Sequence, residues 1–478
     1  MENIDRRNFI STLGGTTFCM GMAGAESIGD NINNNDMFAS KEIFKEVKDI
    51  VDKTSFVDTH EHLPSESERI ANKSNRDKTP APDMGMLFSH YADSDLQVAG
   101  MSDKEYKKLT SWDLSPQEKW RLLAPYYNRC RNTGYLLCVR ESIFALYGEE
   151  DLNENNCEEI SQKIKDDIQP GFYRRILRDV ANIEHAQINC LSSGTFRESE
   201  PATDLLSFDL STVGIASSIS KIGNLNKFAD KPIKTLKQAH ETIEHIFERF
   251  GPKAIAVKDQ SAYGRPLFYE NVKDEDIEII FKQFVQKPSS LKYEELKAIQ
   301  DNLFRKCLQC ATEYKLPVKL HTGYFAGYNG MDLSRVRNNL CDLVPLIKDF
   351  PNTTFVLMHI SYPYQNELIA LCKHYRNVYA DMCWSWIIDP ASATRFLREF
   401  LMAAPASKIF TFGGDYIPVE LVPGHARIAR KGITLAITQL LQEGWLNESD
   451  TPALIQRIMN QNAHETFDLP RVLKAYKA

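Results

Sequence analysis

Short apolar runs that lead into a polar side chain recur along this chain. The run Ser55–Val57 leads into Asp58-Thr59-His60-Glu61-His62. Comparable runs end directly before His321 and His359, and another ends shortly before Asp415. Runs of this length, rich in β-branched and aromatic residues, are typical of buried strands. We therefore predict one strand before each of these polar groups.

Further runs of the same kind complete a predicted series of eight strands, and amphipathic stretches such as 236–250 and 291–314 separate them. Strands that alternate with helices form parallel sheets, and eight such units form a (β/α)8 barrel of the TIM type. The predicted fold class is therefore α/β, a TIM-type barrel. The remaining strands are expected at 186–191, 205–210, 254–257 and 377–380.

One connection is several times longer than an average barrel unit of roughly 30 residues. It runs from 63 to 183, after the first strand, and has mostly helical patterns. Loops at the carboxyl ends of barrel strands surround the functional site of such folds. We therefore expect the helical insertion 63–183 to lie beside the site, where it selects a substrate or closes over it. Its helices are expected at 104–110, 116–133, 135–147 and 158–180.

The polar residues at the predicted strand ends converge only if the strands run parallel around one axis. His60 and His62 are two positions apart in an extended segment, so their side chains point the same way. Imidazoles and a carboxylate suit Zn²⁺, Mn²⁺ or Fe²⁺. Each residue alone is more simply explained as a core histidine or a turn-capping aspartate. Their joint occurrence at strand ends favours a metal site.

Composition narrows the class of protein. The chain has 478 residues, of which 43% are hydrophobic and 25% charged, and its formal net charge is −7. This composition is typical of a globular protein. We find no basic stripe of the kind that binds nucleic acid and no apolar run long enough to span a membrane. A small molecule is the expected partner.

The amino terminus has the features of an export signal. Arg6-Arg7 followed by Phe9 is a twin-arginine pattern, and Ala23-Gly24-Ala25 supplies a cleavage site of the A-x-A type. We therefore expect a signal at 1–25 with export to the periplasm or beyond, followed by a linker and entry segment at 26–53. A polar tail with two chance arginines is the alternative.

With these residues in place, the chain resembles the amidohydrolase superfamily, in particular the branch with the uronate isomerases and the aminocarboxymuconate-semialdehyde decarboxylases. The resemblance covers the barrel, about 54–470. It implies that His60, His62, His321 and Asp415 bind a divalent metal. We expect one ion, with Zn²⁺ first and Mn²⁺ or Fe²⁺ as alternatives.

The resemblance also concerns the fourth and sixth strands. The segment 257–265 is similar to amidohydrolase domains fused to glutamine synthetase in plants and fungi. His359 stands where family members either bind a second metal or place a catalytic base. Lys258 stands where two-metal members carry a bridging carboxylated lysine, but one-metal relatives have an unmodified lysine there. A lysine that merely pairs with Asp259 is the simpler structural alternative.

The expected reaction is hydrolysis of an amide, ester or lactone. A bound metal lowers the pKa of water from 15.7 to roughly 7. Asp415 would accept a proton from that water, and His359 would polarise the substrate carbonyl. Decarboxylation and uronate isomerisation on the same site are the alternatives. A binding protein without activity is disfavoured, because every expected ligand position is filled.

Four residues are the expected walls of the substrate pocket. The planar guanidinium of Arg265 suits a substrate carboxylate, and Tyr263 lies two positions before it. Trp384 and Trp386 follow the seventh strand and could stack on a ring, with core packing as the alternative. The sequence leaves open both the substrate and the oligomeric state, although members of the family often form homo-oligomers.

Overall fold

The computed structural model describes residues 34–76, 79–189, 191 and 194–477. The chain divides into two compact units, Met1–Glu42 and Ile43–Ala478. The predicted signal at 1–25 lies outside the described residues. The described part begins with helix α1 (Asn34–Lys53), so the later part of the expected linker and entry segment is helical.

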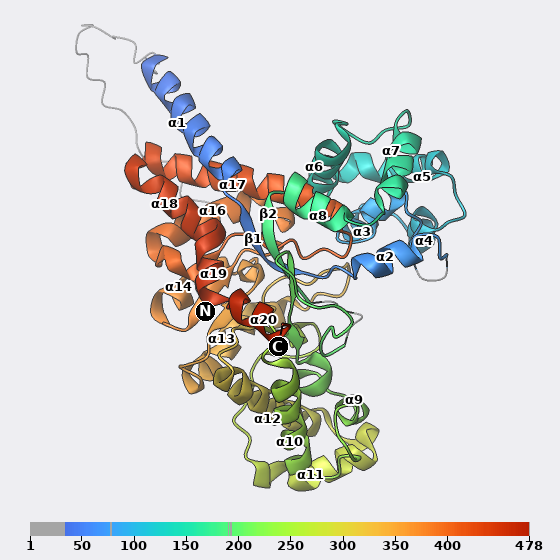
Figure 1. Ribbon diagram of the computed structural model, residues 1–478, viewed down its shortest axis with the longest axis vertical. Helices are drawn as coiled ribbons and strands as arrows, with labels where there is room; N and C mark the ends of the chain where they lie inside the picture. The colour runs from blue at the N-terminus through green and yellow to red at the C-terminus, as the bar shows by residue number, and fades with distance from the viewer. Residues whose placement is uncertain (1–33, 77–78, 190, 192–193, 478) are drawn as a thin grey trace, which may run out of the picture. The chain divides into compact units, whose positions relative to one another are not determined.

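All the strand pairs described are parallel, and the strands follow one another in chain order (Figure 1). They form a sheet of β1-β2-β3 and a sheet of β4 to β9. The predicted α/β class with parallel strands is therefore confirmed. The strands are β1 (Phe56–Glu61), β2 (Ile183–Ile188), β3 (Leu206–Phe208), β4 (Leu210–Ser211), β5 (Val257–Asp259), β6 (Val318–Leu320), β7 (Phe355–Leu357), β8 (Val378–Asp381) and β9 (Ile409–Phe410).

The third predicted strand is divided into β3 and β4 because the backbone changes partner at Asp209. The Asp209 N–H donates to the Ile188 carbonyl at 2.9 Å, whereas the next N–H, of Leu210, donates to the Ala256 carbonyl at 2.9 Å. One strand thus serves both sheets. This break explains why the structure has two sheets where the sequence predicted one continuous barrel wall.

Ladder pairing does not join β9 to β1 in the described part of the chain, but hydrogen bonds cross this gap. The Thr59 N–H donates to the Phe412 carbonyl at 3.1 Å, and the Asp415 N–H donates to the His60 carbonyl at 2.9 Å. The His62 N–H donates to the Tyr416 carbonyl at 3.0 Å. The segment after β9 therefore lies directly beside the end of β1.

Between β1 and β2 the chain forms a group of helices that lie together in Figure 1. Two of them begin at capping boxes, in which Ser102 pairs with Glu105 and Ser115 with Glu118. These helices are α2 (Glu66–Asn72), η1 (Met84–Phe88), α3 (Ala92–Val98), α4 (Asp103–Thr110), α5 (Pro116–Cys130), α6 (Gly134–Tyr147), α7 (Cys157–Asp167), α8 (Phe172–Arg174) and η2 (Arg175–Val180).

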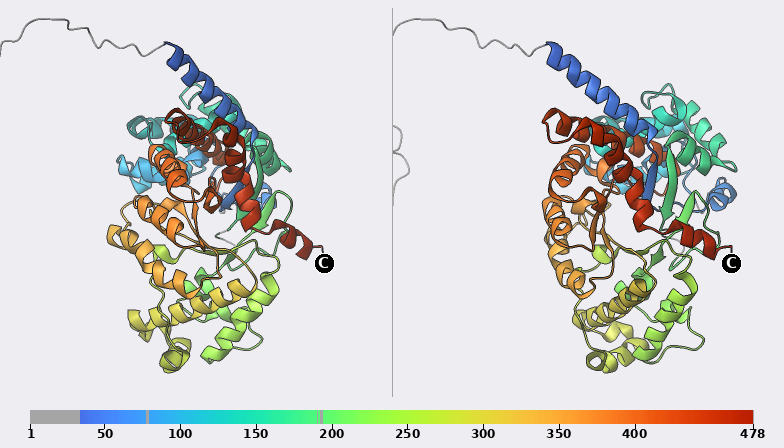
Figure 2. Two further views of the ribbon diagram at one scale, coloured as in Figure 1. Left: turned by 90° about the vertical axis from the view of Figure 1, so that its left-hand side faces the viewer. Right: turned by 60° about the vertical axis from the view of Figure 1, so that its left-hand side comes forward.

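The other helices connect the strands or follow β9, and Figure 2 shows the yellow and orange ones outside the strands of similar colour. Their apolar faces are buried; α10, for example, buries Leu236, Ile243 and Phe250. The main ones are α9 (Gly223–Asn226), α10 (Leu236–Phe250), α11 (Asp274–Gln286), α12 (Tyr293–Glu313), α13 (Leu333–Asp349), α14 (Gln365–His374), α15 (Ser385–Ile388), α16 (Pro390–Ala403), α17 (Val422–Gln442), α18 (Thr451–Gln456), α19 (Asn462–Thr466) and α20 (Leu469–Ala475). Single turns include η4 (Val213–Ser217), η5 (Ser261–Tyr263), η7 (His359–Ser361) and η9 (Val419–Leu421).

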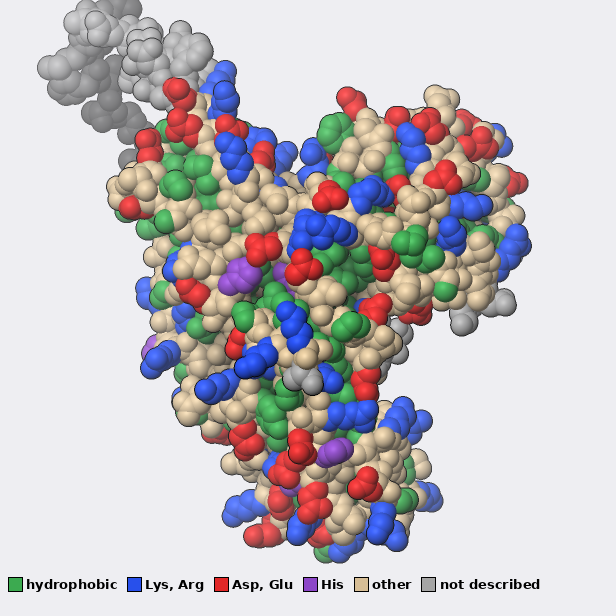
Figure 3. Space-filling model, viewed as in Figure 1, with side chains coloured by type: hydrophobic (Ala, Val, Ile, Leu, Met, Phe, Trp, Pro, Cys, Tyr) green, Lys and Arg blue, Asp and Glu red, His purple; other side chains and the backbone are tan. Residues whose placement is uncertain are grey.

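Lysine and arginine are interspersed with aspartate and glutamate on the face drawn in Figure 3. Within the described ranges, no helix combines the length and the apolar character needed to cross a membrane.

Candidate metal centre

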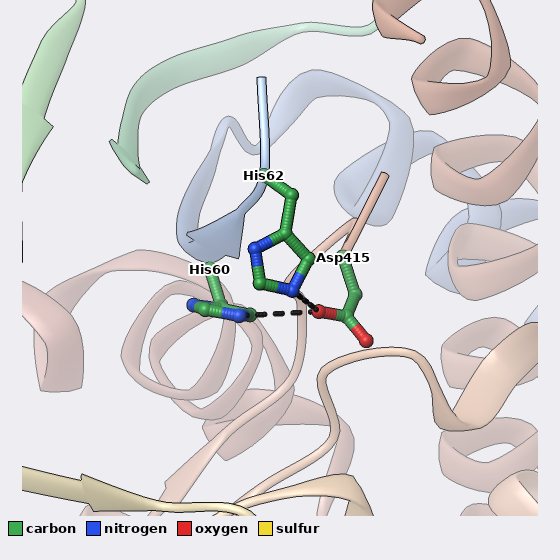
Figure 4. Close-up of side chains that lie close together, drawn as sticks. All are labelled: His60, His62 and Asp415. Carbon is green, nitrogen blue, oxygen red and sulfur yellow. Dashed lines mark ion pairs between the residues drawn. The ribbon is translucent and has the colours of Figure 1, made fainter. Parts of the chain in front are cut away.

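Three of the predicted ligands meet where β1 and the segment after β9 lie side by side. The Nε2 atoms of His60 and His62 are each 3.1 Å from Oδ1 of Asp415. Figure 4 shows the carboxylate facing both rings. Ligand atoms on an ion bound at about 2.1 Å lie roughly 3–3.5 Å apart. The spacing of these three atoms therefore fits one shared ion.

The histidine tautomers also fit a metal. Nδ1 of His62 donates to the Asn189 carbonyl at 2.6 Å, which leaves the Nε2 lone pair directed at Asp415. Neither ring nitrogen of His60 has a hydrogen-bond partner within the described chain, although the ring is fully buried. Buried polar atoms are rarely left unpaired. A divalent ion bound beside Asp415 would satisfy the Nε2 atom of His60.

Electrostatics favour the protonation states that ligate metals. Burial by itself raises the pKa of Asp415, but the adjacent His60 and His62 side chains outweigh it and hold the pKa well below its usual range. Burial, helped by the Lys258 ammonium, lowers the pKa of His60 to about 4. At neutral pH the site therefore contains a carboxylate and a neutral imidazole, the forms that bind a metal.

The helical insertion contributes a residue to this centre that the sequence did not reveal. The Tyr91 hydroxyl donates to Oδ2 of Asp415 and lies 2.8 Å from its carbonyl oxygen. The neighbouring His90 accepts a hydrogen bond on Nδ1 from the Ile417 N–H at 3.3 Å. A His-Tyr pair before a short helix carries no distinctive pattern, so only the folded chain reveals it.

A second cluster of ligand atoms shares Asp415. His359 lies two residues after β7 and Cys383 two residues after β8, and the ligand atoms of both lie within 4.8 Å of each other and of Asp415. Sequence reasoning named His359 but missed Cys383. The sequence feature that could have indicated Cys383 is its position: it lies two residues beyond Asp381, near a strand end, like the predicted ligands.

His321 lies beside these clusters but belongs to neither of them. Its ring centroid is 4.4 Å from that of His359, and its Nε2 donates to the Tyr324 carbonyl at 2.9 Å. Nδ1 then carries the free lone pair, so it is the atom of His321 that remains available to bind a metal. Its place in the ligand set therefore stays a prediction, whereas His60, His62 and Asp415 are brought together.

Two buried lysines point from the strands into this region. Lys258 makes no hydrogen bond through its ammonium to any described residue, and burial lowers its pKa although Asp415 opposes that shift. Asp259 instead accepts from Thr212 at 2.8 Å and from Ser261, so the predicted Lys258–Asp259 pair does not form. Neighbouring side chains of a strand point to opposite faces, which explains the separation.

The second buried lysine, Lys319 on β6, was not singled out from the sequence. Its ammonium contacts both carboxylate oxygens of Asp209 at 2.9 Å and the Thr59 carbonyl at 2.7 Å. Oδ2 of Asp209 lies 3.8 Å from Nδ1 of His60. This ion pair therefore supports the ring of His60 from the side opposite the centre.

The prediction that Arg265 binds a substrate carboxylate is corrected by its contacts. Its guanidinium is 3% exposed and pairs with Asp301 of α12. It also donates to Gln300 at 3.0 Å and to the Ser217 carbonyl at 3.3 Å. Arg265 thus joins the loop after β5 to α12, and its donors are directed at the protein itself.

The two predicted tryptophans have different surroundings. Trp386 belongs to the core, because its indole N–H donates to the Thr411 carbonyl at 2.8 Å and its ring packs against Gly432 of α17. Trp384 lies at the centre, with its ring 4.6 Å from Tyr91 and 5.3 Å from His359. Trp386 was predicted to line the substrate pocket, and the structure corrects this prediction because the side chain is packed in the core.

Tyr263 lies at the rim of the centre. Its ring is 4.6 Å from His321 and 5.0 Å from Phe325, and the residue is 41% exposed. Its hydroxyl accepts from the Ala326 N–H at 3.1 Å. Tyr263 therefore contacts both solvent and His321.

Backbone strain concentrates at this centre. Tyr91, His359, Trp384 and Asp415 have positive φ values of 66°, 62°, 65° and 60°. Residues other than glycine rarely adopt this region, and such strain persists where the surrounding fold enforces it, often at functional sites. The strained residues come from the insertion and from three separate strand ends.

The carboxyl-terminal half of the barrel matches known proteins in sequence. Residues 287–469 match the family model described as Amidohydrolase. Protein fluG of Emericella nidulans is 29% identical over 178 residues, which cover 35% of this chain and 20% of that protein. The chain thus spans about one fifth of the length of this curated relative.

Solved structures are similar over nearly the whole chain. Glucuronate isomerase from Caulobacter crescentus has a TM-score of 0.71 and 16% identity, covering 90% of this chain and 95% of its own. A protein described as a metal-dependent hydrolase from Lactobacillus casei has a TM-score of 0.61 and 17% identity, covering 89% and 98%. These likenesses confirm the predicted TIM-type fold. The match to the Amidohydrolase family concerns residues 287–469, and over the rest of the chain the likeness to these solved structures is one of fold.

Proposed function

We propose that this enzyme is a metal-dependent hydrolase that acts on an amide, ester or lactone of a small molecule. The observation that carries the proposal is the ionised Asp415, with Oδ1 facing the Nε2 atoms of His60 and His62. A divalent ion at this position, for which Zn²⁺ is the first expectation, supplies Lewis-acid activation of water. The superfamily typically binds such an ion, and we infer one ion at these three residues.

Asp415 is the group that takes the proton from the attacking water. Its pKa lies well below the usual range, so it is ionised and able to accept a proton at neutral pH. The Tyr91 hydroxyl donates to Oδ2 and fixes the plane of the carboxylate. General-base catalysis of this kind contributes typically about 10²–10⁴-fold.

His359 is better suited to accept than to donate. Its Nδ1–H is used by the Cys383 carbonyl at 3.1 Å, and burial lowers its pKa to about 3. The neutral ring therefore has no N–H left for a substrate oxygen. We assign the stabilisation of the developing oxyanion to Lys258, whose ammonium makes no hydrogen bond to the described residues and lies within electrostatic range of Asp415.

A second candidate is aldose–ketose isomerisation of a uronate. It is favoured by the likeness to glucuronate isomerase over 90% of the chain. The insertion also brings the hydroxyl of Tyr91 and the imidazole of His90 beside the centre, where they suit a polyhydroxylated substrate. Decarboxylation, the other alternative from the sequence, has no observation of its own in its favour.

Isotope labelling separates these reactions. Purified protein is screened with lactones, N-acyl amino acids and uronates in ¹⁸O-labelled water. Hydrolysis predicts label in the carboxylate of the product, and Asp415→Asn should lower turnover by about 10²–10⁴-fold. A ketose formed without water-derived oxygen in a new carboxylate would support isomerisation instead, and release of CO₂ would support decarboxylation.

We also propose export in the folded state by a twin-arginine signal. The support is the pattern Arg6-Arg7 with Phe9 and the site at Ala23-Gly24-Ala25. Fractionation should find the parent cleaved outside the cytoplasm and Arg6→Lys/Arg7→Lys uncleaved inside it. Equal distribution of two uncleaved proteins would refute this proposal.

A further inference from the structure

We propose that Cys383 supplies a sulfur ligand to the metal centre, in a second ion position formed with His359 and Asp415. This inference rests on the proposed metal-dependent function and deepens it. It adds a ligand type that neither the predicted histidine–aspartate set nor a carboxylated Lys258 includes. Asp415 would then be shared with the position at His60 and His62.

Geometry is the first support. The ligand atoms of His359, Cys383 and Asp415 lie within 4.8 Å of one another, and all three side chains are buried. Zn–S bonds are about 2.3 Å and Zn–N bonds about 2.0–2.1 Å. Donor atoms grouped this closely can all reach one ion with small side-chain adjustments.

The tautomer of His359 is the second support. Its Nδ1–H donates to the backbone carbonyl of Cys383 at 3.1 Å. The free lone pair is therefore on Nε2, as in a metal-binding histidine whose other nitrogen is held by a carbonyl. The same contact ties the imidazole to the residue whose thiol completes the cluster.

The third support is the way the fold places the thiol. The Cys383 N–H donates to Oδ1 of Asp381 at 2.8 Å, which fixes the backbone just beyond β8. A Cβ at Gly413 would lie 2.7 Å from the Cys383 Cβ and 2.9 Å from its Sγ. The missing side chain at Gly413 therefore makes room for the thiol.

The sulfur of Cys383 is not engaged in a hydrogen bond within the described chain. Cys138, for comparison, lies with its sulfur 3.3 Å from the Leu421 carbonyl, to which it donates. The Cys383 thiol has no such acceptor among the residues described. Its sulfur is therefore free to bind an ion, and the thiol proton passes to solvent when the bond forms.

Sulfur ligation gives the position a defined preference. Thiolates favour Zn²⁺, Co²⁺ and Cd²⁺, whereas Mg²⁺, Ca²⁺ and Mn²⁺ prefer oxygen ligands. We therefore expect the centre to select thiophilic ions. Cobalt is the most informative probe, because sulfur-to-cobalt charge transfer absorbs in the near ultraviolet and does not depend on activity.

The test loads the purified full chain with Co²⁺ after removal of bound metal. The parent should develop the charge-transfer band, and Cys383→Ser should lose it together with one equivalent of ion. Cys372→Ser, which removes a buried thiol on α14 outside both clusters, should keep the band. Far-ultraviolet circular dichroism confirms that each variant is folded.

A titration of the parent with Cd²⁺ provides a measurement that needs no variant. A sulfur-to-cadmium band that saturates with the second equivalent of ion is expected. No band in the parent with either metal, or a cobalt band that persists in Cys383→Ser, would overturn the inference. Failure of the hydrolysis assay would leave these spectra unchanged, so the two proposals fail separately.

Discussion

Asp415 is the residue on which the account depends, because its two oxygens face different groups. Oδ1 faces the Nε2 atoms of His60 and His62, and Oδ2 accepts from the Tyr91 hydroxyl. Its φ of 60° belongs to the left-handed region. The backbone conformation and three side chains therefore jointly fix the carboxylate that is to accept a proton.

The contribution of Tyr91 is testable at this scale. Tyr91→Phe removes one donor to a buried charged acceptor, an interaction worth about 1.5–3 kcal/mol. We expect turnover to fall roughly 10–100-fold at saturating metal. Steady-state kinetics with a substrate from the labelling screen measure this.

Tyr127→Phe is the matched control, because Tyr127 is also in the insertion but donates to Asp151. It should leave turnover nearly unchanged. Equal losses in the two variants would mean that the insertion acts through stability and that Tyr91 has no particular role.

At the scale of elements, the loop after β9 and the end of β1 form one tightly packed unit. Gly413 and Gly414 lie where the loop crosses β1, and a Cβ at Gly414 would be 1.8 Å from Oε1 of Glu61. That carboxylate is held in place, since Oε2 accepts the Tyr416 N–H at 2.7 Å. The glycine thus permits the close approach that positions Asp415.

Gly414→Ala should therefore disturb both stability and the metal centre. Overpacking of this kind costs about 1–3 kcal/mol, and displacement of the loop should lower metal content. Gly223→Ala is the control, because a Cβ at that position would meet no heavy atom within 4 Å. Thermal melts and elemental analysis of both variants test this, and unchanged metal content in Gly414→Ala would contradict it.

Another contact between elements predicts a pH dependence. Nε2 of His464 on α19 lies 3.0 Å from Oε1 of Glu184 on β2. This bond raises the pKa of His464 and lowers that of Glu184 to about 2. The contribution of His464 stabilises the fold fully below the pKa that this histidine has in the unfolded chain. It is lost as the pH rises through the higher pKa of His464 in the folded protein. The contribution of Glu184 is present above the pKa that this glutamate has in the unfolded chain. It is lost as the pH falls toward its pKa of about 2 in the folded protein.

The pair should therefore contribute most at about pH 4.5–6.5. Because both side chains are partly exposed, its value is only about 0.2–1 kcal/mol. His464→Asn should lower Tm more at pH 5.5 than at pH 8.5. His374→Asn, at an exposed site, should show no such difference, and equal losses at both pH values for His464→Asn would count against the ion pair.

The sequence predicted the elements better than the contacts between them. Apolar runs ending at His60, His359 and Asp415 were sufficient to place strand ends, because strand alternation is a local property. Arg265 was assigned wrongly because its partner Asp301 lies on α12, and nothing in the local pattern shows that ion pair. Cys383 was missed because the apolar run before it already ends at Asp381, and a single cysteine forms no repeated motif.

At the scale of the whole molecule, the described chain combines a nearly closed barrel with an insertion that completes its site. Barrel strands supply ligands from their carboxyl ends, and the insertion supplies Tyr91. The sequence predicted that the insertion lies at this face, but a hydrogen bond to a ligand requires the folded geometry. Substrate selection by the insertion remains a prediction.

The central claim is that His60, His62 and Asp415 hold a divalent ion, and metal analysis tests it most directly. Elemental analysis of the purified full chain should find at least one equivalent of a divalent transition metal or zinc. His60→Ala/His62→Ala should lose that ion while circular dichroism shows a folded barrel, because these ligands lie at the end of β1 and the strand backbone is unchanged. Full metal content in the folded double variant would contradict the account.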